Sequence, residues 1–315
     1  MLHNGHTDLP TISAYASALT RHGKVILPGA PGTFWTKYES LAMMRVPDFA
    51  LHDPPPGEVE RVLWRGRIAV ASYNAEPDAG RAANACLYVS DDQSYSVEKL
   101  IPAMRRNVRR GLKEFTIGLL NSEQVLARGM PAYCDTRRRV GLSDGTAEAF
   151  ERRFNWYVRC PGHVFVGAWK GDELAAFLSI VKVDDWAEIE GCFSRDMFLS
   201  SRPNDLLMYM VLSRYLTEER LRLVSYGMSS IQQTDNVHGL HAFKTKVGFQ
   251  AKPVHRAFVL HPLLRPFANH FALHGVNAVG RLFPNNRLVK KARGMLALLL
   301  GGEPLVESFT GSHGR

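Results

Sequence analysis

The clearest candidates for chemistry in this sequence are basic side chains grouped on one short segment. Arg105, Arg109 and Lys113 are spaced by four residues, and Arg106 and Arg110 stand next to them. In a helix this spacing places the charges on one side, where they repel each other. Guanidinium groups bind phosphate through paired hydrogen bonds, so the segment predicts a site for a phosphate-bearing ligand. The alternative is a solvated face that pairs with Asp or Glu elsewhere in the fold.

Metal and disulfide chemistry are not expected. The four cysteines, Cys86, Cys134, Cys160 and Cys192, have neither CxxC nor Cys/His ligand spacing, which predicts reduced, buried thiols. Twelve histidines are present, but His238 and His241 lack carboxylate or cysteine companions at ligand spacing. We therefore predict no metal and no tightly bound cofactor.

The composition is that of a folded globular protein of one or two domains. The 315 residues are 45% hydrophobic and 22% charged, enough to bury a full core. The first 19 residues have no secretory pattern, and no run of about 18 apolar residues occurs that would span a bilayer. We expect a cytoplasmic protein.

The net charge of +9 is concentrated in three basic groups. Besides the segment at 105–113, these are Arg137 to Arg139 and a C-terminal group at 281–293. Their expected counterparts are phosphates, on a carrier, a nucleic acid or a membrane surface.

The elements that must position these residues form an α/β (α+β) pattern. In the first half, apolar runs predict strands, and longer periodic stretches predict helices. The predicted strands are 61–74 and 83–89, and the predicted helices are 97–113, 122–140 and 147–157, the last after a glycine-bearing segment at 141–145.

The second half gives a more distinctive order. Three apolar strands come first, then a helix with a proline suited to its first turn, a strand, a second helix ended by Gly248, and a last strand. The order is therefore β-β-β-α-β-α-β. Its predicted elements are 164–169, 174–183, 186–193, 205–216, 221–226, 237–247 and 255–260.

This order resembles the core of the GNAT superfamily (Gcn5-related N-acetyltransferases), and three motifs are similar to those of its FemAB-like branch. The segment at 239–249, GLHAFKTKVGF, looks like the "FK…GF" end of that branch. The segment at 105–113, RRNVRRGLK, resembles its "RxNIRRAxK" helix, and YCDTRRRVG at 133–141 follows in the right order. The resemblance covers roughly residues 60 to 262.

The resemblance implies two GNAT-like domains in tandem. The expected organisation is a flexible N-terminus at 1–20, an N-terminal GNAT-like domain at 21–145, a C-terminal one at 146–262 and a basic amphipathic helical tail at 263–315.

It also implies acyl transfer to an amine, in which a positive group stabilises the developing oxyanion. In the branch a Phe-Lys pair is thought to act in this way, and Phe243 and Lys244 match it. The alternative is that Lys244 is a solvated lysine of an amphipathic helix, like Lys246.

The other predicted catalytic residues lie on strands. Glu190 or Glu188 would deprotonate the amine, and a bulge at Glu190 and Gly191 would open the backbone toward the acyl carbonyl. The two glutamates alternatively form a solvent-facing stripe. Tyr226 ends the parallel strand where the strands of such a fold diverge, or is a core aromatic.

The donor site is expected to include Arg105, Arg106, Asn107, Arg109 and Arg110, together with Arg202 and Asn204. GNAT enzymes that use coenzyme A carry a glycine-rich loop before the helix after the meander, whose amides hold the pyrophosphate. Here that place, residues 198–205, lacks glycine. The missing glycines weigh against coenzyme A, and the predicted co-substrate is either acyl-CoA or an acyl carrier protein.

Three functions follow. The leading one is an N-acyltransferase that uses a phosphate-bearing thioester donor and the amine of a small molecule or amino acid. The second is an aminoacyl-tRNA-dependent Fem-type transferase, although the long helical hairpin of such enzymes is not visible. The third is a GNAT-like binding module without catalysis.

The composition of the C-terminal tail bears on where the protein is located. Residues 261–300 mix basic and apolar side chains, and no acid occurs between Arg265 and Leu300. The tail either lies on an anionic membrane surface, making the protein peripheral on the inner face of the cell membrane, or packs on the domain.

Overall fold

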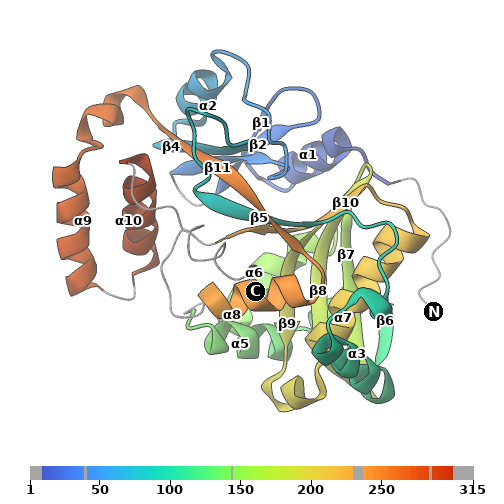
Figure 1. Cartoon of the computed structure of the whole chain (residues 1–315). Helices are drawn as coiled ribbons and strands as arrows, with labels where there is room; N and C mark the ends of the chain where they lie inside the picture. The colour runs from blue at the N-terminus through green and yellow to red at the C-terminus, as the bar shows by residue number, and fades with distance from the viewer. Residues whose placement is uncertain (1–8, 39–40, 143–144, 230–236, 284–285, 301–315) are drawn as a thin grey trace. The chain divides into compact units, whose positions relative to one another are not determined.

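The structure is a computed structural model that describes residues 9–38, 41–142, 145–229, 237–283 and 286–300. Helices and strands alternate along the chain, which confirms the predicted α/β class (Figure 1). The chain divides into two compact units, each built from separate segments. The first consists of Met1–Ala18, Val89–Gly227 and Phe243–Gln250, and the second of Leu19–Tyr88, Met228–Ala242 and Ala251–Arg315.

The elements have the following bounds. The strands are β1 (Ile26–Pro28), β2 (Phe34–Tyr38), β3 (Ala42–Val46), β4 (Val70–Ala75), β5 (Ala85–Ser90), β6 (Thr116–Leu120), β7 (His163–Lys170), β8 (Glu173–Val183), β9 (Trp186–Ser194), β10 (Leu223–Met228) and β11 (Gln250–Leu260). The helices are α1 (Ile12–Arg21), α2 (Glu58–Gly66), α3 (Pro102–Glu114), α4 (Ser122–Arg128), α5 (Met130–Arg139), α6 (Ala147–Tyr157), α7 (Pro203–Leu212), α8 (Val237–Lys246), α9 (His270–Leu282) and α10 (Arg287–Leu299). Short turns η1 (Val97–Lys99), η2 (Asp196–Ser201), η3 (Ser213–Glu218) and η4 (Pro262–Phe267) complete them.

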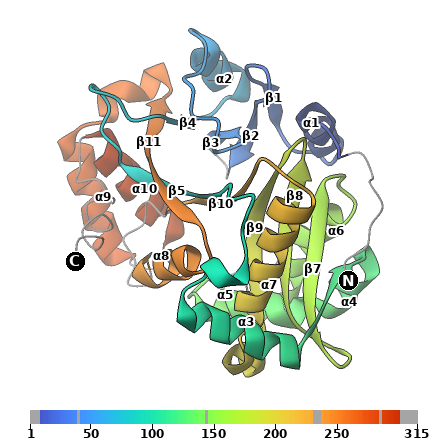
Figure 2. The same cartoon turned by 45° about the vertical axis from the view of Figure 1, so that its right-hand side comes forward.

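The first unit is a sheet with helices on both faces. Strands β6, β7, β8 and β9 pair antiparallel in that order, and β10 pairs parallel to β9. Figure 2 shows α7 and α3 in front of this sheet and α5 and α6 behind it. The parallel step requires a crossover, which α7 provides.

Aromatic side chains form the core between the sheet and α5 and α6. Phe154 of α6 lies at its centre, within 6.0 Å, centroid to centroid, of the rings of Tyr133, Phe165, Phe177 and Phe193. Such offset and edge-to-face ring pairs stabilise a core beyond simple burial. This packing fixes α5 and α6 against β7, β8 and β9.

Two irregularities of β9 open the sheet. The pairing of β9 with β10 ends at Glu188 and Ser225, although β9 continues to Ser194. On its other edge, the register with β8 shifts so that Glu190 is the extra residue of a bulge, as the sequence predicts. A Cβ on Gly191 would lie 2.5 Å from the ring of Phe193, so only glycine fits beside the bulge.

In the second unit the strand order is β1-β2-β3-β4-β11. Strand β3 pairs parallel to β4, with α2 as the crossover, and β11 pairs antiparallel to β4. The last strand predicted for the second half therefore belongs to the sheet of the first half. The predicted junction between residues 145 and 146 lies inside the first unit.

Two sequence expectations are wrong in detail. The strand predicted at 61–74 is helix up to Gly66, because Val59, Val62 and Leu63 have helical spacing and pack on one side. The N-terminus predicted as flexible at 1–20 contains α1, whose Tyr15 is buried; residues 1–8 lie outside the described residues. The strand β6 was not predicted from the sequence.

Candidate active site

Three of the predicted residues, Lys244, Tyr226 and Phe243, lie together at the end of β10. Nζ of Lys244 donates to the carbonyl oxygen of Tyr226 at 2.7 Å and lies 4.6 Å from the centroid of the tyrosine ring. The ring of Phe243 meets that of Tyr226 edge-on, with 6.5 Å between centroids. Lys244 is only 4% exposed, so it is not the solvated lysine of the alternative interpretation. A buried ammonium acts on nearby charge with little screening.

The segment after Lys244 explains how α8 presents this residue. Gly248 has a φ of +108°, a conformation that ends the helix and that favours glycine. A Cβ there would lie 2.6 Å from the ring of Tyr95, whose hydroxyl donates to the carbonyl oxygen of Val247 at 2.7 Å. Val247 and Phe249 are buried on either side of the glycine. The "GF" end of the motif is therefore an anchor that fixes the last turn of α8.

Asp205 joins three helices next to this cluster. Its buried carboxylate accepts from Nδ2 of Asn107 on α3 at 2.6 Å and lies 2.9 Å from Nζ of Lys246 on α8. Nζ of Lys246 in turn lies 5.1 Å from the centroid of the Phe243 ring. The motif segments of α3 and α8 thus meet through Asp205 of α7. The amide nitrogen of Asn107, predicted to contact the donor, points to this carboxylate.

The arginines of α3 are arranged differently. Arg106, Arg109 and Arg110 are exposed, and Arg105 is half-buried with one long hydrogen bond of 3.4 Å to the carbonyl oxygen of Glu98. Within the described part of the chain, no carboxylate lies at ion-pair distance from any of the four. Glu98 attracts Arg105 and Arg109, and Glu114 attracts Arg110, over longer distances, so acids of the fold compensate their charge only in part.

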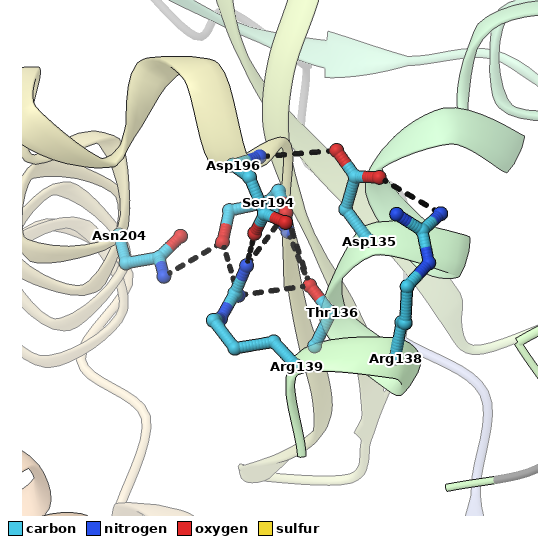
Figure 3. A network of polar contacts seen from close by, with 7 residues as sticks. All are labelled: Asp135, Thr136, Arg138, Arg139, Ser194, Asp196 and Asn204. Atoms are coloured by element: carbon cyan, nitrogen blue, oxygen red, sulfur yellow. Dashed lines mark hydrogen bonds and ion pairs between the residues drawn. The ribbon is translucent and has the colours of Figure 1, made fainter. Parts of the chain in front are cut away.

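A polar network holds the start of α7 (Figure 3). Arg139 at the end of α5 donates to the hydroxyl of Ser194 at 3.0 Å and pairs with Asp196. Nδ2 of Asn204 also donates to the Ser194 hydroxyl, at 3.1 Å, and the hydroxyl of Thr136 accepts from the Ser194 amide at 2.8 Å. Asn204, predicted as a donor-binding residue, thus uses its amide nitrogen to connect α7 with β9.

The first turn of α7 differs from a backbone cradle for pyrophosphate. Arg202 precedes it with a φ of +64° and an exposed side chain. Pro203 at the first position has no N–H, and the carboxylate of Asp205 already lies in the first turn. Negative charge at a helix N-terminus is stabilising, and here an internal side chain supplies it.

Glu190 lies away from these helices, at the bulge of β9. Its Oε2 is 3.9 Å from Nδ1 of His163, whose side chain is fully buried. The other ring nitrogen, Nε2, is 3.2 Å from the hydroxyl of Tyr15, and the ring stacks on Tyr157 with 4.4 Å between centroids. The side chain of Glu190 is 24% exposed and Glu188 is half-buried, so the two do not form a fully solvated stripe.

Burial decides the protonation of this cluster. It lowers the pKa of His163 to about 3, with the charge of Arg153 adding to the effect, so the imidazole is neutral. Burial also raises the pKa of Tyr15 far above its usual value, and the charge of Glu190 raises it further. In the tautomer whose Nε2 accepts from the Tyr15 hydroxyl, Nδ1 carries the proton that faces Glu190.

The protonation of Tyr226 and Cys192 follows the same rule. Burial raises the pKa of Tyr226 well above its usual value, so the hydroxyl keeps its proton. Burial also raises the pKa of the Cys192 thiol to about 12, against the opposing charge of Arg139. A neutral thiol is a poor nucleophile.

Sequence reasoning missed His163, Asp205, Ser194 and the role of Arg139. Of these four, only Arg139 stands out in the sequence, because it belongs to the basic run at 137–139. Each of the other three has a partner 58 to 148 residues away, which no local spacing reveals.

Metal-ligand groups and membrane-spanning helices are both absent among the described residues. No three or more His, Cys, Asp or Glu side chains gather there in a way that would hold a metal ion. Every described helix is too short or too polar to cross a bilayer.

Comparisons with known proteins give the fold. No family profile matches the chain, and no curated protein matches its sequence. A solved C-terminal domain of an Agrobacterium fabrum protein named as a lysylphosphatidylglycerol synthetase is 17% identical, with a TM-score of 0.55 over 78% of this chain and 87% of that one.

Two other solved structures are also similar. FemX is 10% identical, with a TM-score of 0.55 over 82% of this chain and 94% of its own. L-PGS from Bacillus licheniformis is 12% identical, with a TM-score of 0.51 over 82% of this chain and 95% of its own. The chain therefore shares its fold with FemX, with L-PGS and with the Agrobacterium fabrum domain, which agrees with the resemblance of its motifs to the FemAB-like branch.

Proposed function

We propose that this protein is a transferase that moves an acyl group from a carrier thioester to the amine of a small molecule or amino acid. The observation that carries this proposal is the buried ammonium of Lys244 at the end of β10, beside Tyr226. Attack of an amine on a carbonyl creates an oxyanion, and a fixed positive charge in a poorly hydrated place stabilises it. Tyr226, whose hydroxyl stays protonated, would be a second hydrogen-bond donor.

The proposed reaction places the carbonyl where β9 and β10 diverge. Beyond Glu188 and Ser225 the two strands no longer pair, and an extended donor would lie along β9 there. Glu190, displaced by the bulge, would take the proton of the amine, and the neutral His163 would orient its carboxylate.

The donor would be held by its phosphates on α3. Arg105, Arg106, Arg109 and Arg110 carry four positive charges, and none of them forms an ion pair with an acid among the described residues. The first turn of α7, with Pro203 and Asp205, lacks the features of a pyrophosphate cradle. These observations favour a carrier held by arginines, an acyl carrier protein more than free acyl-CoA.

A second candidate is aminoacyl transfer from tRNA. It is favoured by the name of the Agrobacterium fabrum protein, because lysylphosphatidylglycerol is an aminoacyl product. A tRNA would also satisfy the arginines of α3, and its binding would weaken steeply with salt.

A comparison of donors tests the proposal. The purified full chain is incubated with one labelled acyl group on coenzyme A or on acyl carrier protein, or with labelled aminoacyl-tRNA, and with a mixture of amino acids and small amines. Mass spectrometry then identifies the product. We expect an N-acyl product from a thioester donor, and more from the carrier protein. A product from aminoacyl-tRNA alone would establish the second candidate, and no product from any donor would contradict both.

A pair of double variants tests the donor site in the same assay. Arg105→Ala with Arg109→Ala is expected to raise the KM for the donor about tenfold, since two phosphate contacts are lost. Arg152→Ala with Arg159→Ala removes the same charge from exposed positions outside α3 and is expected to leave the KM unchanged. Equal KM values for the two variants would contradict the assignment of α3.

A further inference from the structure

Helix α9, the one before α10, has exposed apolar residues opposite its half-buried Ala272, Leu273 and Val276. Phe271, Val279 and Leu282 are 88%, 43% and 75% exposed, and Gly275 and Ala278 lie exposed between them. Their spacing of i, i+4, i+7, i+8 and i+11 puts all five on one side of the helix. A helix on the surface of a soluble domain has the opposite arrangement, with apolar residues facing inward.

The elements on either side of α9 in the sequence also carry exposed apolar side chains. Leu263 and Phe267 of η4 are 69% and 68% exposed, and Phe283 and Leu288 after α9 are 59% and 63% exposed. Residues 263–288 hold eight of the eighteen exposed large hydrophobic side chains found in the described residues. So dense a group is unusual on a protein that remains in water, and it marks an interaction surface. We call residues 263–293 the apolar-basic segment.

The charge of the apolar-basic segment is of one sign. From Arg265 to Leu300 there are six Arg and Lys residues and no Asp or Glu. Arg281, Lys290 and Arg293 are exposed. Arg265 lies 3.6 Å from Glu60, and Lys291 donates to the hydroxyl of Tyr38 at 2.8 Å, so these two have partners within the fold. The surface therefore combines exposed apolar side chains with exposed cations.

We propose that the apolar-basic segment docks on an anionic phospholipid surface, with the exposed side of α9 lying in the interface. Phe271, Leu282 and Phe267 would enter the boundary between headgroups and acyl chains, and Arg281, Lys290 and Arg293 would lie at the lipid phosphates. Helix α9 has 13 residues, about 20 Å, which is shorter than the roughly 30 Å of a bilayer core. It lies on the membrane and does not span it.

Charge favours a lipid surface over a second copy of the chain. Two apolar-basic segments facing each other would bring twelve cations together without one carboxylate from residues 265–300, and like charges repel. Anionic headgroups provide the opposite charge, and the boundary between headgroups and acyl chains can bury the aromatic side chains.

Vesicle co-sedimentation of the full-length protein tests the proposal independently of any enzyme activity. Vesicles of phosphatidylcholine alone are compared with vesicles containing about a third of phosphatidylglycerol. The protein is expected to sediment with the anionic vesicles at least about tenfold more strongly, and added salt is expected to weaken the binding.

Two double variants distinguish an effect of the α9 surface from an effect of added negative charge anywhere on the protein. Phe271→Glu with Leu282→Glu changes α9, while Leu41→Glu with Met197→Glu places the same charge on two similarly exposed apolar residues elsewhere. The α9 variant is expected to lose at least about tenfold in vesicle affinity, and the control is expected to bind like the wild type. Equal binding by both variants would overturn the proposal. So would a dimer in sedimentation velocity that the α9 variant dissociates, with no binding of the wild type to either vesicle.

Discussion

Lys244 and His163 are both buried, and they contact different kinds of groups. Nζ of Lys244 meets a carbonyl oxygen and the face of an aromatic ring, both of which attract a cation. The ring of His163 is enclosed by Tyr157, Trp156 and Phe165 with Arg153 nearby, and it stays neutral. The proposed chemistry needs both states, a fixed positive charge for the oxyanion and a neutral ring beside the base.

His163 predicts a specific dependence of stability on pH. Its pKa is about 3 in the folded protein and near its usual 6.5 when unfolded, so between these values only the unfolded chain takes up the proton. The free energy of unfolding therefore falls as pH falls below 6.5. From pH 7 to pH 5 this residue is expected to account for about 2 kcal/mol of lost stability.

Urea denaturation of the wild type and of His163→Gln at pH 7 and pH 5 measures this contribution. The variant is expected to lose about 2 kcal/mol less than the wild type between the two pH values. His270→Gln, at an exposed position, is expected to behave like the wild type. An identical pH dependence of His163→Gln and wild type would show that His163 takes up its proton in the folded state.

At the scale of elements, the close approach of α3 and α7 places Asn107 beside Asp205. A Cβ on Gly111, one turn after Asn107, would lie 2.9 Å from Cβ of Leu206, so only glycine allows this approach. Helix α3 therefore presents its arginines from a fixed position next to the start of α7.

The variant Gly111→Ala tests this contact. Alanine favours helix by up to about 1 kcal/mol, yet here the added methyl group is expected to destabilise the protein by about 1–3 kcal/mol, because the helices must separate. Gly275→Ala in α9 is the matched control, since nothing lies within 4 Å of its Cβ position. Chemical denaturation should show a gain or no change for Gly275→Ala, and a gain for Gly111→Ala would contradict the packing.

The sequence predicted those elements whose ends carry local signals. The turn at Gly171, the proline at the start of α7 and the glycine after α8 all have short-range causes. The helix α2 was mistaken for a strand because its short apolar run fits both periods. Strand β6 has only five residues, and its pairing with β7 is not a local property.

In the candidate site, too, residues with a local sequence signal were predicted and residues without one were not. Phe243, Lys244 and Tyr226 were predicted through motif resemblance, and the structure brings them together. Asp205 was placed near the start of a predicted helix but without a role in the site, because its partners lie on other helices. The outward-facing apolar side of α9 depends on which side of the helix is covered, which composition alone does not determine.

At the scale of the whole molecule, the two units are not consecutive pieces of chain. Each contains segments from the first and the second half, and β11 completes the sheet that contains β4. A strand without its partner exposes a row of unpaired backbone groups. Each half of the chain therefore needs the other.

Cutting the chain at the predicted junction, between residues 145 and 146, tests this interdependence. The fragment 1–145 lacks β11 beside β4, and the fragment 146–315 lacks β6 beside β7. We expect neither fragment alone to show cooperative thermal unfolding by circular dichroism, and the two expressed together to associate and unfold cooperatively. Cooperative unfolding of either fragment by itself would show that the halves are independent domains.

The central claim is that the buried ammonium of Lys244 stabilises the oxyanion of an acyl transfer. Single-turnover kinetics of Lys244→Met, with the donor identified for the wild type, test it most directly, because methionine keeps the apolar stem and removes the charge. The rate of transfer is expected to fall by about 100- to 1000-fold while the donor affinity and the unfolding transition stay near those of the wild type. A folded Lys244→Met protein that transfers the acyl group at the wild-type rate would contradict the account.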